Sequence, residues 1–294
     1  MVSQLADRFA KPVWDLVQGV ERLVALPQAW TEINRLIREQ GSGAEIAQAV
    51  ELDTDLSVRL LRLVNSAGYR FSTPVETISR AVSLVGTREL RDLAMLTVAR
   101  RLFTGIPRDL MDLETFWRRS VATGVFGSLL AHRQLVLHGE RLFVMGMAHD
   151  LGLLVICQQL PDQAREILYV AGDDPELLPP AELDLLGYQH QQVGAALMSR
   201  WGLPASLVEV AAFHHDPHLA REFPLEVALI HVAGLVAGGD VLGLDTAAIL
   251  ARVQDGVEER FDLTPAALDD IRRRGADQIA QTARRFLEPV TSRR

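Results

Sequence analysis

The chain contains one cysteine, Cys157, among its 294 residues. A single cysteine excludes an internal disulfide and a thiolate zinc cluster, and such a chain suits a reducing compartment. The N-terminal residues have no continuous apolar core of the kind found in signal peptides, and charges interrupt the later apolar runs. We therefore expect a cytoplasmic protein without a membrane segment, and we expect Cys157 to be a buried small residue.

Aromatic residues make up only 6% of the chain, and basic residues are fewer than acidic ones. The 30 Lys and Arg against 38 Asp and Glu give a formal charge of -8. Binding to duplex nucleic acid usually depends on many basic contacts to phosphates, so we expect no nucleic-acid partner. The scarcity of aromatic residues also argues against a sheet protein.

Leu, Ala and Val dominate the 48% of residues that are hydrophobic. They recur at spacings of three and four in almost every segment, which predicts an all-α fold. Ser42 and Glu45 form a capping-box pattern, Asp53 is placed to cap the next helix, and Thr73-Pro74 is a third start signal. The predicted helices cover about 43–50, 56–66, 74–85, 87–103, 113–134, 140–158, 161–171, 180–201, 204–215, 224–237 and 265–286.

Gly105-Ile106-Pro107 is the best internal boundary, because it follows a basic helix end and precedes a new amphipathic stretch. It predicts an N-terminal helical subdomain over 1–108. A second helical subdomain then covers 109–240, and C-terminal helices over 241–294 pack back on it.

The adjacent pair His149-Asp150 offers an imidazole and a carboxylate that could hold one metal ion. His190 lies on a later helix that also carries Gly194, and His214-His215 closes the helix after that. If these helices pack together, five ligand-capable side chains meet near one point.

These residues stand in an order that resembles the HDOD domain, a relative of the HD metal phosphohydrolases, over about 20–285. The resemblance rests on several stretches in the right order: Leu60 to Tyr69, Pro74, Phe116-Trp117, Ala148 to Gly152, Glu182 ahead of His190, Trp201 to Pro204, and His214-His215. It implies an N-terminal helical bundle packed on an HD-like helical bundle. It also implies a non-catalytic module of bacterial signal transduction, which acts through protein–protein interaction with response regulators or cyclic-dinucleotide signalling enzymes.

The chain departs from the catalytic relatives at two positions of the metal shell that the resemblance implies. Arg119 stands where the first histidine would lie, and Gly234 stands where a late aspartate would lie. Arginine offers no lone pair to a metal. At ~4 Å and an effective dielectric constant near 20, two unit charges repel by about 4 kcal/mol, and a divalent ion doubles that cost. We therefore expect no cofactor and assign no catalytic residue.

Three interpretations of the histidine cluster remain open. In the first, His149 and Asp150 are a buried hydrogen-bonded pair. In the second, the chain is a metal-dependent phosphohydrolase for a nucleotide or cyclic nucleotide, with iron, manganese or zinc held by the residues His149, Asp150, His190, His214 and His215. In the third, Arg119 binds an anionic ligand in a sensor. The sequence predicts neither the partner's identity nor the oligomeric state.

Overall fold

We describe the protein from a computed structural model, which places residues 9–23, 27–66, 69, 71, 73–136 and 139–288. Within these residues all regular structure is helical, and the all-α prediction is confirmed. The sequence predictions that fall on Ala67, Gly68 and the stretches 24–26, 137–138 and 289–294 lie outside the described residues.

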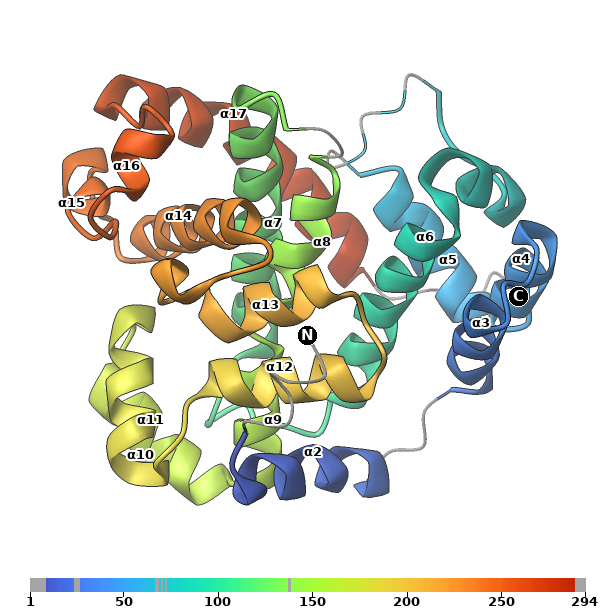
Figure 1. The fold of residues 1–294 in the computed structure, drawn as a ribbon, viewed down its shortest axis with the longest axis horizontal. Helices are drawn as coiled ribbons and strands as arrows, with labels where there is room; N and C mark the ends of the chain where they lie inside the picture. The colour runs from blue at the N-terminus through green and yellow to red at the C-terminus, as the bar shows by residue number, and fades with distance from the viewer. Residues whose placement is uncertain are drawn as a thin grey trace.

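The helices form two groups that lie side by side (Figure 1). Their bounds are α2 Lys11–Leu23, α3 Gln28–Arg38, α4 Gly43–Glu51, α5 Thr54–Val64, α6 Ile78–Leu102, α7 Leu113–Arg133, α8 Arg141–Ala148, α9 Leu151–Gln159, α10 Pro161–Ala171, α11 Leu178–Leu186, α12 His190–Arg200, α13 Ala205–Phe213, α14 Pro224–Val241, α15 Thr246–Leu250, α16 Val257–Arg260 and α17 Pro265–Leu287. Two short 3-10 turns, η1 Pro175–Leu177 and η2 Pro217–Leu219, precede α11 and α14.

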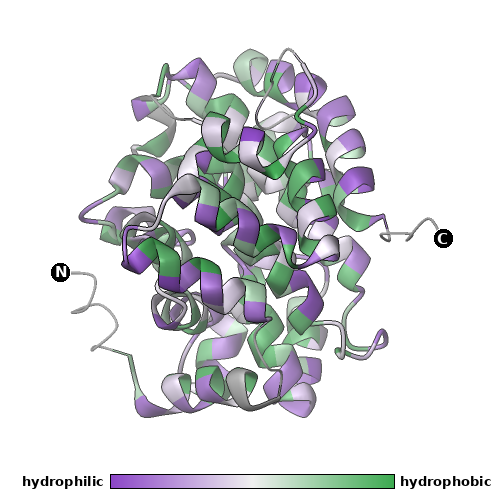
Figure 2. Ribbon diagram, turned by 90° about the vertical axis from the view of Figure 1, so that its right-hand side faces the viewer, coloured by the Kyte–Doolittle hydropathy of each residue, from purple (hydrophilic) through white to green (hydrophobic). Residues whose placement is uncertain are grey.

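The first group packs α3, α4 and α5 against α6. Hydrophobic and hydrophilic residues alternate around these helices, as amphipathic packing requires (Figure 2). The predicted capping box of Ser42 and Glu45 is confirmed, and Asp53 accepts the backbone N–H of Leu56 at the start of α5. Gly86 interrupts α6 with φ 83° and ψ 163°, where the sequence predicted a helix boundary.

The predicted helix start at Thr73 is wrong, because α6 begins at Ile78 and Thr77 is its cap. The amide of Asn65 explains the difference. Its Oδ1 accepts the N–H of Val75 at 2.7 Å, and its Nδ2 donates to the Val75 carbonyl at 2.8 Å. These two bonds occupy both backbone groups of Val75, so the segment cannot supply them to a helix.

The second group is built around α7, which contacts α8, α14 and α17. On the other side of α8, helix α12 lies between α9 and α13. Trp117 on α7 and Trp201 after α12 are buried in the core. The three-part division of the chain stays a prediction, and the structure adds that α2 packs against α9 and α12 of the second group.

Two long helices predicted from periodicity are wrong, because each is two shorter helices. The prediction over 140–158 breaks between α8 and α9 at His149 and Asp150. The prediction over 180–201 breaks at Gly187, which adopts a left-handed conformation with φ 77° at the end of α11. The first break keeps an apolar pattern running through it, so periodicity alone does not reveal it, whereas Gly187 is a local stop signal.

Two segments are long and apolar enough to span a membrane by length and composition alone, Arg141–Gln159 and Pro224–Val241. In the fold 89% of the first and 67% of the second is buried. The first is also divided by the break at His149. Both are therefore core helices of this fold.

A polar cluster centred on Glu89 lies where α6 meets α8. The hydroxyl of Tyr69 donates to Glu89 Oε1 at 2.6 Å, and the Tyr69 ring packs edge-on against Phe143 of α8. Burial raises the pKa of Glu89 to about 7. Asp92 and Glu140 add to the rise, while Tyr69 and Arg141 oppose it. Glu89 is thus a titrating group between the two helix groups.

We expect the Glu89→Gln variant to gain stability relative to wild type as pH rises. The folded-state pKa lies above the usual 4.5, so the proton on Glu89 stabilises the fold fully below pH 4.5, and this contribution is lost as pH rises through about 7. The shift corresponds to at most about 3 kcal/mol, and we expect about 2 kcal/mol because the side chain is partly exposed.

The measurement is urea unfolding of both proteins between pH 5 and pH 8. The control is Glu51→Gln, which changes an exposed side chain on α4. The Glu89→Gln advantage should grow across this range, and the Glu51→Gln difference should stay flat. A Glu89→Gln difference that does not change with pH contradicts the assignment.

Candidate functional site

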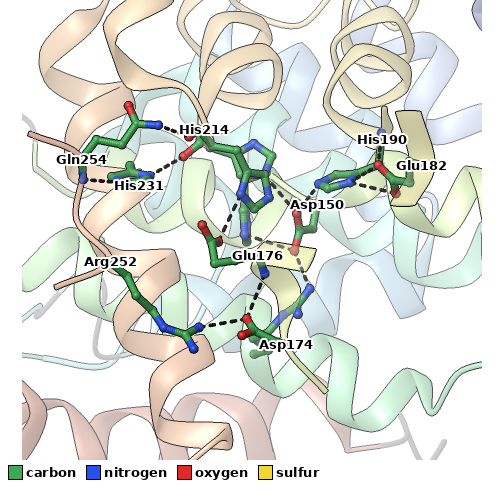
Figure 3. Close-up of polar contacts among 12 residues, drawn as sticks. Asp150, Asp174, Glu176, Glu182, His190, His214, His231, Arg252 and Gln254 are labelled. Atoms are coloured by element: carbon green, nitrogen blue, oxygen red, sulfur yellow. Dashed lines mark hydrogen bonds and ion pairs between the residues drawn. The ribbon is translucent and has the colours of Figure 1, made fainter. Parts of the chain in front are cut away.

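The Asp150 carboxylate is the centre of a buried cluster of histidines (Figure 3). Its Oδ2 lies 3.3 Å from His149 Nε2, and its Oδ1 lies 3.3 Å from His190 Nε2 and 3.2 Å from His214 Nε2. The break between α8 and α9 makes this possible, because Asp150 makes no side-chain capping bond to α9. The carboxylate is therefore free to face α12 and α13.

The histidines are oriented by their Nδ1 atoms. A carbonyl only accepts hydrogen bonds, so His149 Nδ1–H donates to Gly146 O at 2.6 Å and His214 Nδ1–H donates to Ala211 O at 3.1 Å. His190 Nδ1–H donates to the carboxylate of Glu182 at 2.8 Å. In all three rings Nε2 faces Asp150, which is the orientation of metal-ligating histidines.

The charges within the cluster are strongly coupled. Burial alone raises the pKa of Asp150, but His149 and Arg119 outweigh it and hold that pKa well below its usual range. Burial alone lowers the pKa of His190, but Glu182 and Asp150 raise it to about 10. Burial and the neighbouring His215 lower the pKa of His214 well below its usual value. The Asp150 carboxylate thus lies between two histidines whose pKa values are shifted in opposite directions.

Three buried atoms of the cluster make no hydrogen bond: Asp150 Oδ1, His190 Nε2 and His214 Nε2. Buried polar atoms without partners are rare, and a bound ion is one of the things that satisfies them. Their separations of 3.2 and 3.3 Å match the distance between two ligands of a tetrahedral zinc ion, about 3.3 Å. With His215, these residues form a group whose ligand atoms all lie within 4.8 Å of one another. On this side of Asp150 the donor set fits one divalent ion.

Arg119 on α7 occupies the other side of Asp150. Its Nη2 donates to Asp150 Oδ2 at 2.6 Å, so a cationic side chain engages one of the two carboxylate oxygens. Gly234 on α14 is the other departure, and a Cβ built on it would lie 4.0 Å from His149 Nε2. A longer side chain at position 234 would therefore reach into the cluster. Glycine has no side chain and supplies no ligand there.

A short segment after α10 covers the cluster. Glu176 of η1 lies with Oε1 3.2 Å from His215 Nδ1, and Asp174 pairs with Arg252 at 2.9 Å (Figure 3). Burial alone raises the pKa of Glu176, but the hydrogen bond and charge of His215 outweigh it and hold that pKa below its usual value. The cavity left beneath the cover is about 20 Å³. That volume holds a water molecule or an ion and excludes a nucleotide.

The structure therefore brings Asp150, His190, His214 and His215 together and places His149 beside them, as the helix-packing argument predicted. Glu182, eight residues before His190, enters the sequence analysis only as part of the resemblance, without its bond to that ring. Sequence reasoning missed the other supporting residues, for which the chain carries no local signal. They are Glu176 on His215, His231 with Nδ1 donating to the His214 carbonyl, and Gln254 donating to the His215 carbonyl.

Two curated proteins are similar in sequence. A protein of Treponema pallidum (strain Nichols), named only as uncharacterized, is 27% identical over 239 residues, which cover 79% of this chain and 45% of that protein. The cyclic di-GMP phosphodiesterase CdgJ of Vibrio cholerae is 29% identical over 165 residues, which cover 53% of this chain and 34% of CdgJ. The chain thus spans less than half the length of either relative.

Two solved structures share the fold. One, from Shewanella amazonensis SB2B and described as a candidate phosphohydrolase, has a TM-score of 0.71 at 24% identity and covers 92% of this chain and 97% of its own. An HDOD domain protein of unknown function from Geobacter sulfurreducens has a TM-score of 0.66 at 20% identity. The match covers 93% of this chain and 98% of that protein. The sequence model of the HDOD domain matches residues 23–217, which is more than half of the chain. The chain belongs to the HDOD domain family.

Proposed function

We propose that the protein is a non-catalytic signalling module that acts in the cytoplasm through contacts with other proteins. One observation carries the proposal: the guanidinium of Arg119 lies 2.6 Å from Asp150 Oδ2, inside the histidine cluster. A fixed positive charge at this oxygen repels a divalent ion held by the same carboxylate. Such an ion would supply the activated water that phosphodiester hydrolysis uses.

The closed cover supports the same proposal. The cavity of about 20 Å³ beside the cluster has no room for a phosphate diester, and Glu176 and the Asp174–Arg252 pair lie over it. Relatives support a regulatory role, because part of the chain is similar to part of a protein named as a cyclic di-GMP phosphodiesterase. We propose response regulators or cyclic-dinucleotide signalling enzymes as the class of partner.

A second candidate function has an observation in its favour, the three buried atoms without hydrogen bonds. Asp150, His190, His214 and His215 would hold one divalent ion there. Such an ion activates a bound water when the site is open to substrate. Here the ion would lie beneath Glu176, so we propose that its contribution is to hold α9, α12 and α13 together.

The signalling proposal is tested by affinity purification of the intact chain, followed by binding assays with each purified candidate partner. We expect a direct complex with at least one regulatory protein. The complex should be retained in the His190→Ala variant, which removes one ligand-capable side chain of the cluster, as long as circular dichroism shows that the variant is folded. A partner that binds only as a substrate, and is released altered, contradicts the proposal.

A further inference from the structure

The negative charge of the protein is concentrated in residues 161–187. This stretch, which contains α10, η1 and α11, has seven Asp and Glu residues and one Arg, a charge of -6 out of the -8 of the whole chain. Four of the acidic residues are exposed and have no ion pair among the described residues: Asp162, Glu166, Asp173 and Asp184. The single cation, Arg165, pairs with Asp109 at 2.9 Å.

The same stretch is rich in exposed apolar side chains. Ten large hydrophobic residues are exposed in the described part of the chain, and half of them lie here: Tyr169, Val170, Leu177, Leu183 and Leu185. Tyr169 is 88% exposed and Val170 is 63% exposed. Scattered apolar residues need no explanation, but a cluster of this kind indicates a contact surface.

A groove runs on each side of α10. Between α10 and α11 lies a notch of about 190 Å³, lined by Ile167, Val170, Ala181 and Leu185, with Glu166 and Asp184 at its rim. On the far side of α10 is a wider groove of about 600 Å³, whose lining includes Tyr169 and Val241. Helices α10 and α11 pack on each other at one edge of the molecule (Figure 1).

We propose that the α10–α11 hairpin, residues 161–187, is the docking surface for a basic amphipathic helix of a partner protein. This inference rests on the proposed function and specifies where the partner binds. Apolar notches bordered by carboxylates fit a helix whose leucine-like side chains are flanked by Lys or Arg. The same carboxylates repel an anionic membrane and nucleic acid.

The inner face of this hairpin contacts the histidine cluster. Glu182 of α11 is fully buried and accepts both the His190 backbone N–H at 2.8 Å and the His190 side chain. Glu176, between α10 and α11, contacts His215. A helix bound on the outer face of the hairpin would therefore act on the residues that orient the cluster.

The test uses the full chain and two fluorescent amphipathic peptides, one of leucine and lysine and the other with glutamate in place of each lysine. We expect the lysine peptide to bind with an affinity that falls as salt rises, and to protect residues 161–187 from hydrogen exchange. The Asp162→Lys, Glu166→Lys, Asp184→Lys variant should lose at least about tenfold in affinity. Val170→Ser with Leu185→Ser, which changes two exposed residues that line the notch, should lose a similar factor.

Matched controls change the same chemistry elsewhere on the surface. The charge control is the triple variant Glu51→Lys, Glu76→Lys, Asp277→Lys. The apolar control is the double variant Leu52→Ser, Leu135→Ser, and all five residues are exposed. Neither control should change the affinity by more than about twofold.

Three results overturn the docking surface: no binding of the lysine peptide, equal binding by the charge-reversed variant and its control, or exchange protection outside 161–187. A dimer in light scattering that Leu185→Ser dissociates would overturn it too, because a second copy would then occupy the notch. Each of these leaves the non-catalytic proposal standing, since that proposal is contradicted by turnover of a phosphodiester or of a bound partner and not by where a peptide binds.

Discussion

The double variant Arg119→His, Gly234→Asp is expected to bind one divalent ion at least about 100-fold more tightly than the wild-type chain. The first change removes a charge that lies 2.6 Å from Asp150 Oδ2 and supplies an imidazole in its place. The second places a carboxylate where a Cβ would already lie 4.0 Å from His149 Nε2. Removing a repulsion of several kcal/mol and adding two ligands act in the same direction.

Calorimetric titration with Mn²⁺ and Zn²⁺ near pH 7 measures this change. The control is Arg118→His, which removes the neighbouring arginine of α7 that pairs with exposed Glu114 outside the cluster. The control should bind ions as the wild type does. If the double variant gains no affinity, or gains no more than Arg118→His, then Arg119 and Gly234 are not what separates this cluster from a full metal site.

The Gly152→Ala variant should lose at least about 4 kcal/mol of unfolding free energy, enough to deplete the folded protein. Helices α9 and α12 cross at this residue. A Cβ at position 152 would lie 2.0 Å from the His190 carbonyl oxygen and 2.5 Å from the Gly194 nitrogen. Both are backbone atoms, so no side-chain rotation relieves the clash, and α12 would move together with His190.

Urea unfolding followed by circular dichroism measures the loss. Gly105→Ala is the matched control, because its Cβ would have nothing within 4 Å, and it should be neutral within about 0.5 kcal/mol. Where Gly152→Ala does not accumulate, Gly194→Ala gives a milder form of the same clash, with its Cβ 3.2 Å from the Gly152 nitrogen. A Gly152→Ala protein as stable as Gly105→Ala would mean that α9 and α12 do not cross this closely.

Much of the fold was predictable because the helix signals are local. The caps at Ser42 and Asp53 and the break at Gly86 depend on residues within one turn, and the structure confirms them. The start of α6 depends instead on Asn65, which lies 10 residues from Val75 in sequence and binds both of its backbone groups. Contacts across a loop leave no local pattern, so Thr73 gave a false signal.

The cluster was predictable for a different reason, and only in part. His149, Asp150, His190 and His214 are distinctive residue types on apolar helices, so packing those helices brings them together. The cover was not predictable, since Glu176 lies in an irregular turn whose position depends on long-range contacts such as the Asp174–Arg252 pair. The small cavity beneath it, which bears most on function, therefore appears only in three dimensions.

The rate of phosphodiester hydrolysis by the intact chain tests the central claim most directly. The protein is loaded in turn with Mn²⁺, Fe²⁺ and Zn²⁺, its metal content is measured, and bis(p-nitrophenyl) phosphate and cyclic di-GMP are supplied as substrates. With Arg119 on Asp150 and the cluster covered by Glu176, we predict no turnover above the free-metal background, whether or not one ion is bound. Metal-dependent turnover that is lost in His149→Ala would contradict the account.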